Sequence, residues 1–272
     1  DDAGQIRTGI DGFLYYLTPH FEGLTFKRFL QILLDAMSQL FFSLSVSMGI
    51  MITYGSYVKP EINLNRAVNQ IEIFDTGVAL LAGAMIIPAV FVFSGTDGMS
   101  AGPSLMFISL PKVFAAMGKA GNVVGILFFV TTIFATLTSC ISVLESITAN
   151  CMEIFHTTRK KTVLVLTVIY LTASAVIALG YSIFYFEVKL PNGSVGQLLD
   201  IMDYISNSVM MPLIALLSTI LIGWIKTPDY VIDEMESSGD TFHRKKLYRV
   251  MIRYVAPVMM FVLFLQSTGI LS

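Results

Sequence analysis

The segment Gln39-Leu40-Phe41-Phe42-Ser43-Leu44-Ser45-Val46-Ser47-Met48-Gly49 decides how this chain folds, because it interrupts a long apolar run with a hydroxyl at every second position. A regular helix would spread three such hydroxyls around its circumference. If the helix unwinds here, freed carbonyls and hydroxyls can replace the hydration shell of an ion, and the two half-helix ends supply partial charges. Serine side chains can instead bond back to carbonyls of an intact helix or to a neighbouring helix. The spacing alone leaves both alternatives open.

The rest of the sequence is strongly apolar, with 55% hydrophobic and 13% charged residues. A soluble domain of this size could not cover so much apolar surface, so we expect a membrane protein. The formal net charge of −2 gives no electrostatic reason to expect a nucleic-acid partner. His20, His156 and His243 have no spacing that suits a metal site or a catalytic triad. Cys140 and Cys151 would lie about 16 Å apart on a helix, beyond disulfide reach.

Six segments are long and apolar enough to cross a bilayer as helices, which takes about 20 residues. They are residues 29–57, 64–95, 122–154, 162–186, 201–225 and 250–272. The chain opens on Asp1-Asp2-Ala3-Gly4 without a signal peptide, so we expect a fragment of a longer protein. With residues 1–28 as an extracellular loop and 226–249 as a cytoplasmic loop, the inner loops together with Arg66 and Arg253 at the inner ends of their spans hold eleven of the 17 basic residues. The positive-inside rule therefore favours a multi-pass plasma-membrane protein with both ends of the fragment outside.

Residues 96–121 connect the second and third segments on the outer side. They carry Gly98, Gly102 and Pro103, followed by apolar residues at helical spacing. This pattern predicts short helices that lie flat on the membrane. Such a loop can act as a lid over a vestibule, and an interfacial helix pair fits the pattern equally well.

Asp75 is an acidic residue inside an apolar stretch, and its depth in the membrane decides whether its charge needs a partner. If its helix begins near Leu64, Asp75 lies about 16 Å along the helix, near the midplane, where a charge is costly without a partner. If the helix begins nearer Ile73, Asp75 is an ordinary boundary residue.

A stripe of small and hydroxyl-bearing residues follows one face of segment 122–154. Its members recur at three- and four-residue intervals and include Ala135, Thr138, Ser139, Ser142 and Ser146. Close helix packing is the more common role of such a stripe in membranes. The presence of a second hydroxyl-rich segment at Ser43 to Ser47 favours a binding role instead.

The runs Phe41-Phe42-Ser43-Leu44-Ser45 and Ile52-Thr53-Tyr54-Gly55-Ser56-Tyr57 resemble the broken sixth helix of the neurotransmitter:sodium symporter family, and Leu137-Thr138-Ser139 resembles its eighth. The resemblance extends from the outer loop before the sixth helix to Leu199-Asp200-Ile201-Met202-Asp203, at the entry into the tenth. It implies an all-α membrane protein whose six transmembrane helices form the second inverted repeat of a leucine-transporter-like fold, residues 29–225, plus one further helix. The chain would then cover helices six to eleven of an eleven-span bacterial member and lack helices one to five.

By position, the resemblance implies two sodium sites, each completed by the missing first helix. Ser43 and Asp75 would bind the first sodium ion. The carbonyl of Ala135 and the side chains of Thr138 and Ser139 would bind the second. Substrate contacts would come from Phe42, Ser45, Met48, Ser139 and Val143. Three further residues would form gates: Asp203 on the outer side, Glu153 on the inner side, and Tyr57 near the cytoplasm.

Two positions depart from the family pattern. Ser47 stands where the family usually has glycine, so the break is expected to be stiffer or to use the hydroxyl. Asp75 stands where animal members have an asparagine and bind chloride nearby. A fixed carboxylate can substitute for that anion, so chloride is not expected to be required, and Asp75 can be either a sodium ligand or this charge substitute.

The resemblance implies a transporter and not an enzyme: a sodium-coupled symporter that moves a neutral, hydrophobic or aromatic amino acid by alternating access. The expected partners are the amino acid, sodium ions, the lipid bilayer and helices one to five, with no nucleic acid. Two alternatives remain open: a proton-coupled carrier of the same fold in which Asp75 titrates, and a non-transporting scaffold or receptor subunit in which the hydroxyl stripes only pack helices.

Overall fold

The computed structural model describes residues 8–19, 21, 23–59, 61–95, 105–191, 193, 195–237, 239 and 241–270. The first part of the expected lid loop, residues 96–104, therefore lies outside the described residues, as do His20 and the first residues of the expected extracellular loop. The chain divides into two compact units. Unit 1 combines residues 1–28 with Asn69–Ser139, and unit 2 combines Phe29–Val68 with Cys140–Ser272. Each unit is described by itself.

Unit 1 is built around the long helices α4 (Leu64–Ser94) and α6 (Gly118–Phe155), each of which continues into unit 2. The short helix α1 (Gly9–Leu17) begins at a capping box, in which Thr8 and Asp11 satisfy each other's backbone N–H groups. The π-helical turn η2 (Leu105–Ser109) leads into α5 (Leu110–Ala116), so the expected lid loop has helical structure where it is described.

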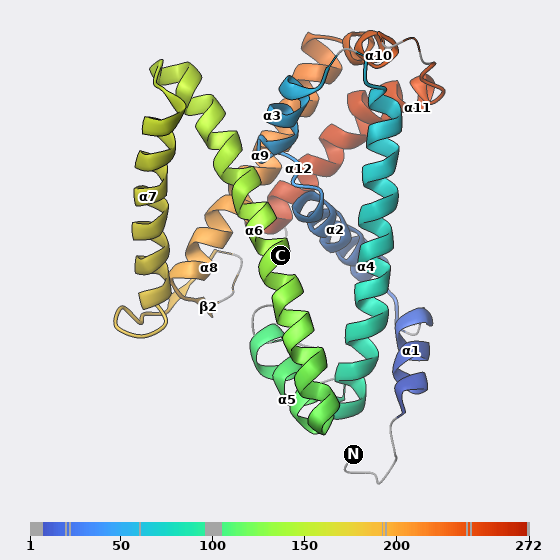
Figure 1. The fold of residues 1–272 in the computed structure, drawn as a ribbon. Helices are drawn as coiled ribbons and strands as arrows, with labels where there is room; N and C mark the ends of the chain where they lie inside the picture. Colours follow the sequence, from blue (N-terminus) through green and yellow to red (C-terminus); the bar gives the residue numbers. More distant parts are fainter. Residues whose placement is uncertain are drawn as a thin grey trace. The chain divides into compact units, whose positions relative to one another are not determined.

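Helix α1 packs along α4 (Figure 1). The absence of a side chain at Gly12 permits this approach, since a Cβ atom there would lie 2.7 Å from the Cα of Pro88. Above and below this contact, the rings of Tyr15 and Phe91 stack with centroids 5.3 Å apart, and the Tyr16 hydroxyl donates to the Leu80 carbonyl at 3.4 Å. The residues expected to form a plain extracellular loop thus include a docked helix.

Unit 2 opens with α2 (Phe26–Ser43) and α3 (Ile50–Tyr57), which divide the first expected segment between them. The second half of α6 is followed by α7 (Arg159–Leu179), and the two form a helical hairpin (Figure 1). Helix α7 ends at Leu179, although the apolar pattern predicts helix to residue 186. The reason is local: the Gly180 N–H bonds to the carbonyls of Val176 and Ile177, and that of Phe184 returns to Leu179, which closes the last turn.

A small antiparallel hairpin of β1 (Val188–Lys189) and β2 (Val195–Gly196) then leads into a continuous helical span in which α-helical and π-helical turns alternate. This span consists of α8 (Leu198–Asp203), the π-helical η3 (Tyr204–Met210), α9 (Met211–Ile220) and the π-helical η4 (Leu221–Ile225). Helix α10 (Pro228–Glu236) lies in the next connection. The last span comprises α11 (Lys245–Val250), the π-helical η5 (Met251–Val255) and α12 (Ala256–Ser267).

The last two spans pack against each other, α9 along α12 and η4 along η5 (Figure 1). Arg253 lies inside an apolar span, where a charged group is costly unless it has partners. Its Nε donates to the Gly223 carbonyl at 3.1 Å, and its guanidinium lies 5.9 Å from the Trp224 ring centroid. The Trp224 indole N–H in turn donates to the Arg253 carbonyl at 2.9 Å. This exchange ties the two π-helical turns together.

Within the described residues, five helical stretches are long and apolar enough to span a membrane. They are Leu64–Phe93, Gly118–Phe155, Arg159–Leu179, Leu198–Ile225 and Lys245–Ser267. The first expected segment, residues 29–57, is absent from this set because its helix is broken between Ser43 and Ile50. Many large apolar side chains face outward, for example Leu81, which is 73% exposed. Lipid solvates such side chains in a multi-pass membrane protein.

Candidate functional site

The interruption between α2 and α3 is a left-handed backbone segment. Ser45, Ser47 and Gly49 all have positive φ angles, of 51°, 66° and 78°. A right-handed helix cannot continue through such residues, and each non-glycine residue in this region costs about 1–2 kcal/mol. The Val46 N–H bonds back to the Phe41 carbonyl at 2.9 Å and closes the end of α2. The backbone of the break is therefore left-handed at every second residue, namely Ser45, Ser47 and Gly49.

Helix α3 is docked on the second half of α6 by a ladder of hydroxyl groups. Thr53, which is buried, donates from Oγ1 to Ser146 Oγ at 3.2 Å, and Ser146 is only 3% exposed. One turn away, the Tyr54 hydroxyl donates to Ser142 Oγ at 2.5 Å. Gly49 lies at the start of this contact, where a Cβ atom would approach Ser146 Oγ to 3.1 Å. The serine stripe of α6 therefore packs α3 over residues 142–146.

The same contact ends in a charged cluster. The Tyr57 hydroxyl donates to Glu145 Oε1 at 2.8 Å. Arg159, at the start of α7, binds both carboxylate oxygens of Glu145, at 3.0 Å and 2.5 Å. Glu145 has a 17% exposed side chain, whereas Glu153, the acid assigned to the inner gate by resemblance, lies exposed near the end of α6. Glu145 is the carboxylate that binds Tyr57.

A polar cleft of about 350 Å³ lies between α2, the η3 region and α12, entirely within unit 2. Its polar lining comprises Asp35, Ser38, Gln39, Asp203, Asn207, Ser208 and Ser267. Phe42 also lines this cleft, so the structure brings together the aromatic residue and the outer acid that were assigned from sequence. The Asn207 side chain donates to Asp203 Oδ1 at 2.5 Å and orients that carboxylate. The lining contains two carboxylates and no basic residue.

Sequence reasoning did not single out Asp35, Gln39 or Asn207. A signal for the first two was present, since Asp35 and Gln39 are four residues apart and Phe42 follows three residues later, which places all three on one face of a helix. A lone acid within an apolar helical segment is by itself a pointer to a polar cavity.

Three oxygen-bearing residues converge on α6 within unit 1. The Ala135 carbonyl accepts hydrogen bonds from Thr138 Oγ1 at 2.8 Å and from Ser139 Oγ at 3.2 Å. These three residues are the ones assigned to the second sodium site, and both hydroxyl oxygens lie within hydrogen-bond distance of the Ala135 carbonyl oxygen. Neutral carbonyl and hydroxyl oxygens are hard ligands that suit a hard cation.

Asp75 lies in unit 1, on α4, and is half-buried. Helix α4 begins at Leu64, so Asp75 lies about 16 Å along it. Ser43, the residue assigned to the same sodium site, belongs to unit 2, as do Ser45, Met48 and Val143. Ser45 and Met48 are half-buried within the break, and Val143 is 38% exposed on α6.

Comparison with known proteins gives a consistent result. A family model described as the sodium:neurotransmitter symporter family matches residues 5–271. The chain is 31% identical to an uncharacterised sodium-dependent transporter of Bacillus subtilis, over 98% of this chain and 57% of that protein. It is 27% identical to an uncharacterised sodium-dependent transporter of Methanocaldococcus jannaschii, over 100% of this chain and 53% of that protein. The chain spans about half the length of the curated relatives it matches.

Among solved structures, the chain is similar to MhsT in complex with L-phenylalanine, with 32% sequence identity and a TM-score of 0.78. The match covers 95% of this chain and 56% of MhsT. The expectation of an all-α membrane protein with a leucine-transporter-like fold is confirmed by this similarity, with the broken helix accounting for five rather than six uninterrupted spans. The family consists of transporters and not of enzymes. This multi-pass chain belongs to the sodium:neurotransmitter symporter family.

Proposed function

We propose that the full-length protein to which this chain belongs is a sodium-coupled symporter of a neutral, hydrophobic or aromatic amino acid, working by alternating access. Helices one to five of the family would complete both sodium sites and the rest of the pocket. We place it in the plasma membrane, with both ends of this chain outside.

The left-handed break at residues 44–49 carries this proposal. It divides a membrane helix into two halves, and the N-terminal end of α3 places the positive end of a helix dipole at the break. Discontinuous helices of this kind bind the carboxylate of a zwitterion and coordinate its coupling ions in secondary transporters. A packing role alone gives no reason for two non-glycine residues to be held at positive φ.

The convergence of Ala135, Thr138 and Ser139 supports one sodium site on α6. A sodium ion would replace the two internal hydrogen bonds with ion–oxygen contacts, so the helix need not rearrange to bind it. We propose Asp75, with Ser43, for the other site, where its carboxylate is either a sodium ligand or the fixed charge that makes chloride unnecessary. Two sodium ions moving inward through 100 mV supply about 4.6 kcal/mol, enough for over a thousandfold gradient of a neutral substrate.

The choice of amino acid rests on two observations. Met48 and Val143, the apolar residues assigned to the pocket, carry no charge, and the similar MhsT structure contains L-phenylalanine. The acidic cleft lined by Asp203 and Phe42 would be the outer approach to the pocket, closed by a basic residue from the missing first helix. On the inner side, we propose that the Tyr57, Glu145 and Arg159 cluster acts together with Glu153 to close the cytoplasmic path.

Uptake of radiolabelled phenylalanine by the full-length protein in proteoliposomes tests the proposal. We expect accumulation in sodium and none when sodium is replaced by choline. Equal uptake in the two buffers would contradict sodium coupling. Uptake that follows the pH gradient and ignores sodium would instead favour a proton-coupled carrier in which Asp75 titrates.

A further inference from the structure

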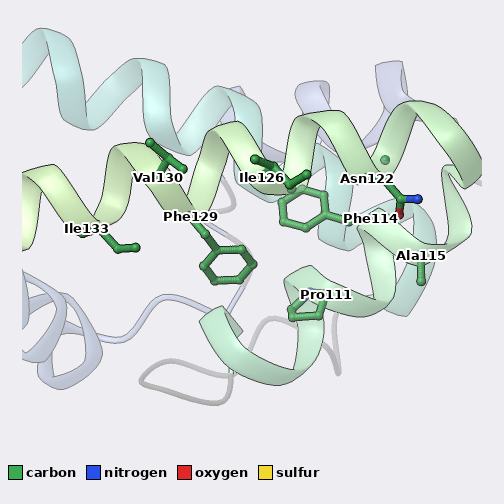
Figure 2. A pocket seen from close by; sticks show the side chains of 10 residues that line it. Pro111, Phe114, Ala115, Asn122, Ile126, Phe129, Val130 and Ile133 are labelled. Atoms are coloured by element: carbon green, nitrogen blue, oxygen red, sulfur yellow. The ribbon is translucent and has the colours of Figure 1, made fainter.

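The place where η4 meets η5 carries a charged side chain that takes no part in the proposed ion, substrate or gate contacts. We call Trp224, Arg253 and Tyr254 the η4–η5 surface; all three belong to unit 2. It differs from the apolar groove between α5 and the first half of α6 (Figure 2), whose lining residues carry no charge and therefore select no particular occupant. The η4–η5 surface offers a charge at a defined position.

Two spans together place the Arg253 side chain at the boundary of the membrane. The span Leu198–Ile225 ends one residue after Trp224, whose indole N–H donates to the Arg253 carbonyl at 2.9 Å. On its own helix, Arg253 follows the basic residues of α11 and lies three residues after Val250, about 4.5 Å into the apolar part of the last span. Tryptophan is enriched at this level of membrane proteins. The guanidinium is therefore at the depth of lipid headgroups.

The charge of Arg253 is not balanced by any residue that the structure describes. Its Nε donates one of the five N–H groups of the guanidinium to the Gly223 carbonyl at 3.1 Å. The four N–H groups on Nη1 and Nη2 form no hydrogen bond or ion pair within the described ranges. Arg249, one turn earlier, binds Asp229 at 2.5 Å, so that pair adds no net charge. A lone cation at this depth is costly unless an anion binds it.

The guanidinium is also held in place beside apolar surface. It lies 5.9 Å from the centroid of the Trp224 ring, and the rings of Trp224 and Tyr254 meet edge to face with centroids 6.0 Å apart. Both rings are largely exposed, by 58% and 56%. A planar guanidinium whose Nη groups are available matches the geometry of two phosphate oxygens. The exposed rings beside it can be covered by the glycerol and acyl chains of the same molecule.

We propose that the η4–η5 surface binds an anionic phospholipid, with the Nη groups of Arg253 on its phosphate and its acyl chains against Trp224 and Tyr254. The occupant is a lipid and not a free phosphate ion, because a free ion would not cover the two exposed rings. A headgroup such as that of phosphatidylglycerol brings the net negative charge that Arg253 lacks, whereas a zwitterionic headgroup brings its own cation. One basic residue near anionic lipid should favour it about fivefold, which corresponds to about 1 kcal/mol.

Quenching of Trp224 fluorescence by brominated lipid tests the proposal without reference to transport. The full-length protein is reconstituted in phosphatidylcholine that contains increasing fractions of brominated phosphatidylglycerol or brominated phosphatidylcholine. The variant Trp224→Phe is measured in parallel, and the difference between the two proteins reports on Trp224 alone. We expect half-maximal quenching of Trp224 at an about fivefold lower ratio of brominated to unlabelled lipid for phosphatidylglycerol than for phosphatidylcholine.

Three variants assign this preference to the guanidinium. Arg253→Gln should bring the two quenching curves together. Arg244→Gln is the matched control, because it removes the same charge just before α11, outside the apolar part of the span, and it should leave the preference unchanged. Because Arg253→Gln also loses the bond to Gly223, Val250→Glu provides a variant that keeps this bond. Val250 is exposed three residues before Arg253, so its carboxylate should compete for the guanidinium and remove the preference.

Four results would overturn the proposal. Equal half-maximal ratios in the unmodified protein would exclude an anionic headgroup. Trp224 fluorescence that neither lipid quenches would show that another part of the full-length protein, or a second copy, covers the surface. A preference that survives Arg253→Gln, or Val250→Glu where Arg253→Gln does not fold, would exclude Arg253 as the phosphate ligand. Excess inorganic phosphate that removes the preference would show that the surface binds a free phosphate ion.

Discussion

Replacing Gly49 by alanine should uncouple α3 from α6. Gly49 has φ of 78°, and an added Cβ atom would lie 3.1 Å from Ser146 Oγ. The left-handed conformation costs an alanine about 1–2 kcal/mol. Moving Ser146 aside also weakens the hydrogen bond from Thr53, which is worth about 0.5–1.5 kcal/mol. We therefore expect Gly49→Ala to lower the free energy of unfolding of the full-length protein by about 2–3 kcal/mol.

The measurement is the unfolding midpoint in mixed detergent–SDS micelles, with two companion variants. Gly55→Ala is the matched control, because Gly55 lies within α3 with nothing near its Cβ position, so alanine should be neutral or stabilising there. Adding Ser146→Ala to Gly49→Ala removes the steric part, and the cost of the glycine substitution should fall to about 1–2 kcal/mol. If Gly49→Ala is as stable as Gly55→Ala, the break does not require a left-handed residue at this position and our reasoning about α3 fails.

Three further predictions concern charged groups. Glu145→Gln should lower the thermal stability of the full-length protein more than Tyr57→Phe, because it weakens the contacts to both Tyr57 and Arg159. Equal losses of stability in the two variants would argue against a shared cluster. Asp75→Ser should slow uptake and make it respond to added chloride, and a folded variant that ignores chloride would count against charge compensation. The Lys245 ammonium holds the pKa of Glu236 below its usual value of about 4.5, so the contact between α10 and α11 is stabilised at neutral pH and loosens as the pH falls below that value. Hydrogen exchange of α10 amides should show this acid-induced opening, and Glu236→Gln should remove its pH dependence.

The spacing of hydroxyls and a glycine at Ser43 to Gly49 marked where the helix could break but left an intact helix open, and the family resemblance implied the break. The sequence did not predict which residues of the break adopt positive φ, because the conformations of Ser45, Ser47 and Gly49 depend on how α3 docks. The serine stripe of α6 was read as either packing or binding, and the structure shows that its parts differ. Ser142 and Ser146 bond to α3, whereas Thr138 and Ser139 bond to the carbonyl of their own helix.

Contacts between distant segments account for most of what the sequence did not reveal. The ion pair of Glu145 and Arg159 forms because α6 and α7 fold back as a hairpin, and helical periodicity does not specify that turn. Asp35 and Asn207 come from helices that lie far apart in the sequence, and only the packing of unit 2 brings them to one cleft. Helix α7 ends at Leu179 because Gly180 closes the turn, although the apolar composition continues beyond it.

The most direct test of sodium coupling is sodium-dependent binding of labelled phenylalanine to the full-length protein carrying Thr138→Ala and Ser139→Val. The matched control carries Thr131→Ala and Thr172→Val, because those hydroxyls also bond back to a carbonyl of their own helix, at 2.8 Å each. We predict that the first pair abolishes sodium-dependent binding with little loss of folded protein, and that the control pair preserves it. Sodium-dependent binding that survives in the Thr138 and Ser139 variant, or loss of the folded protein only in that variant, would contradict the assignment of a sodium site to α6.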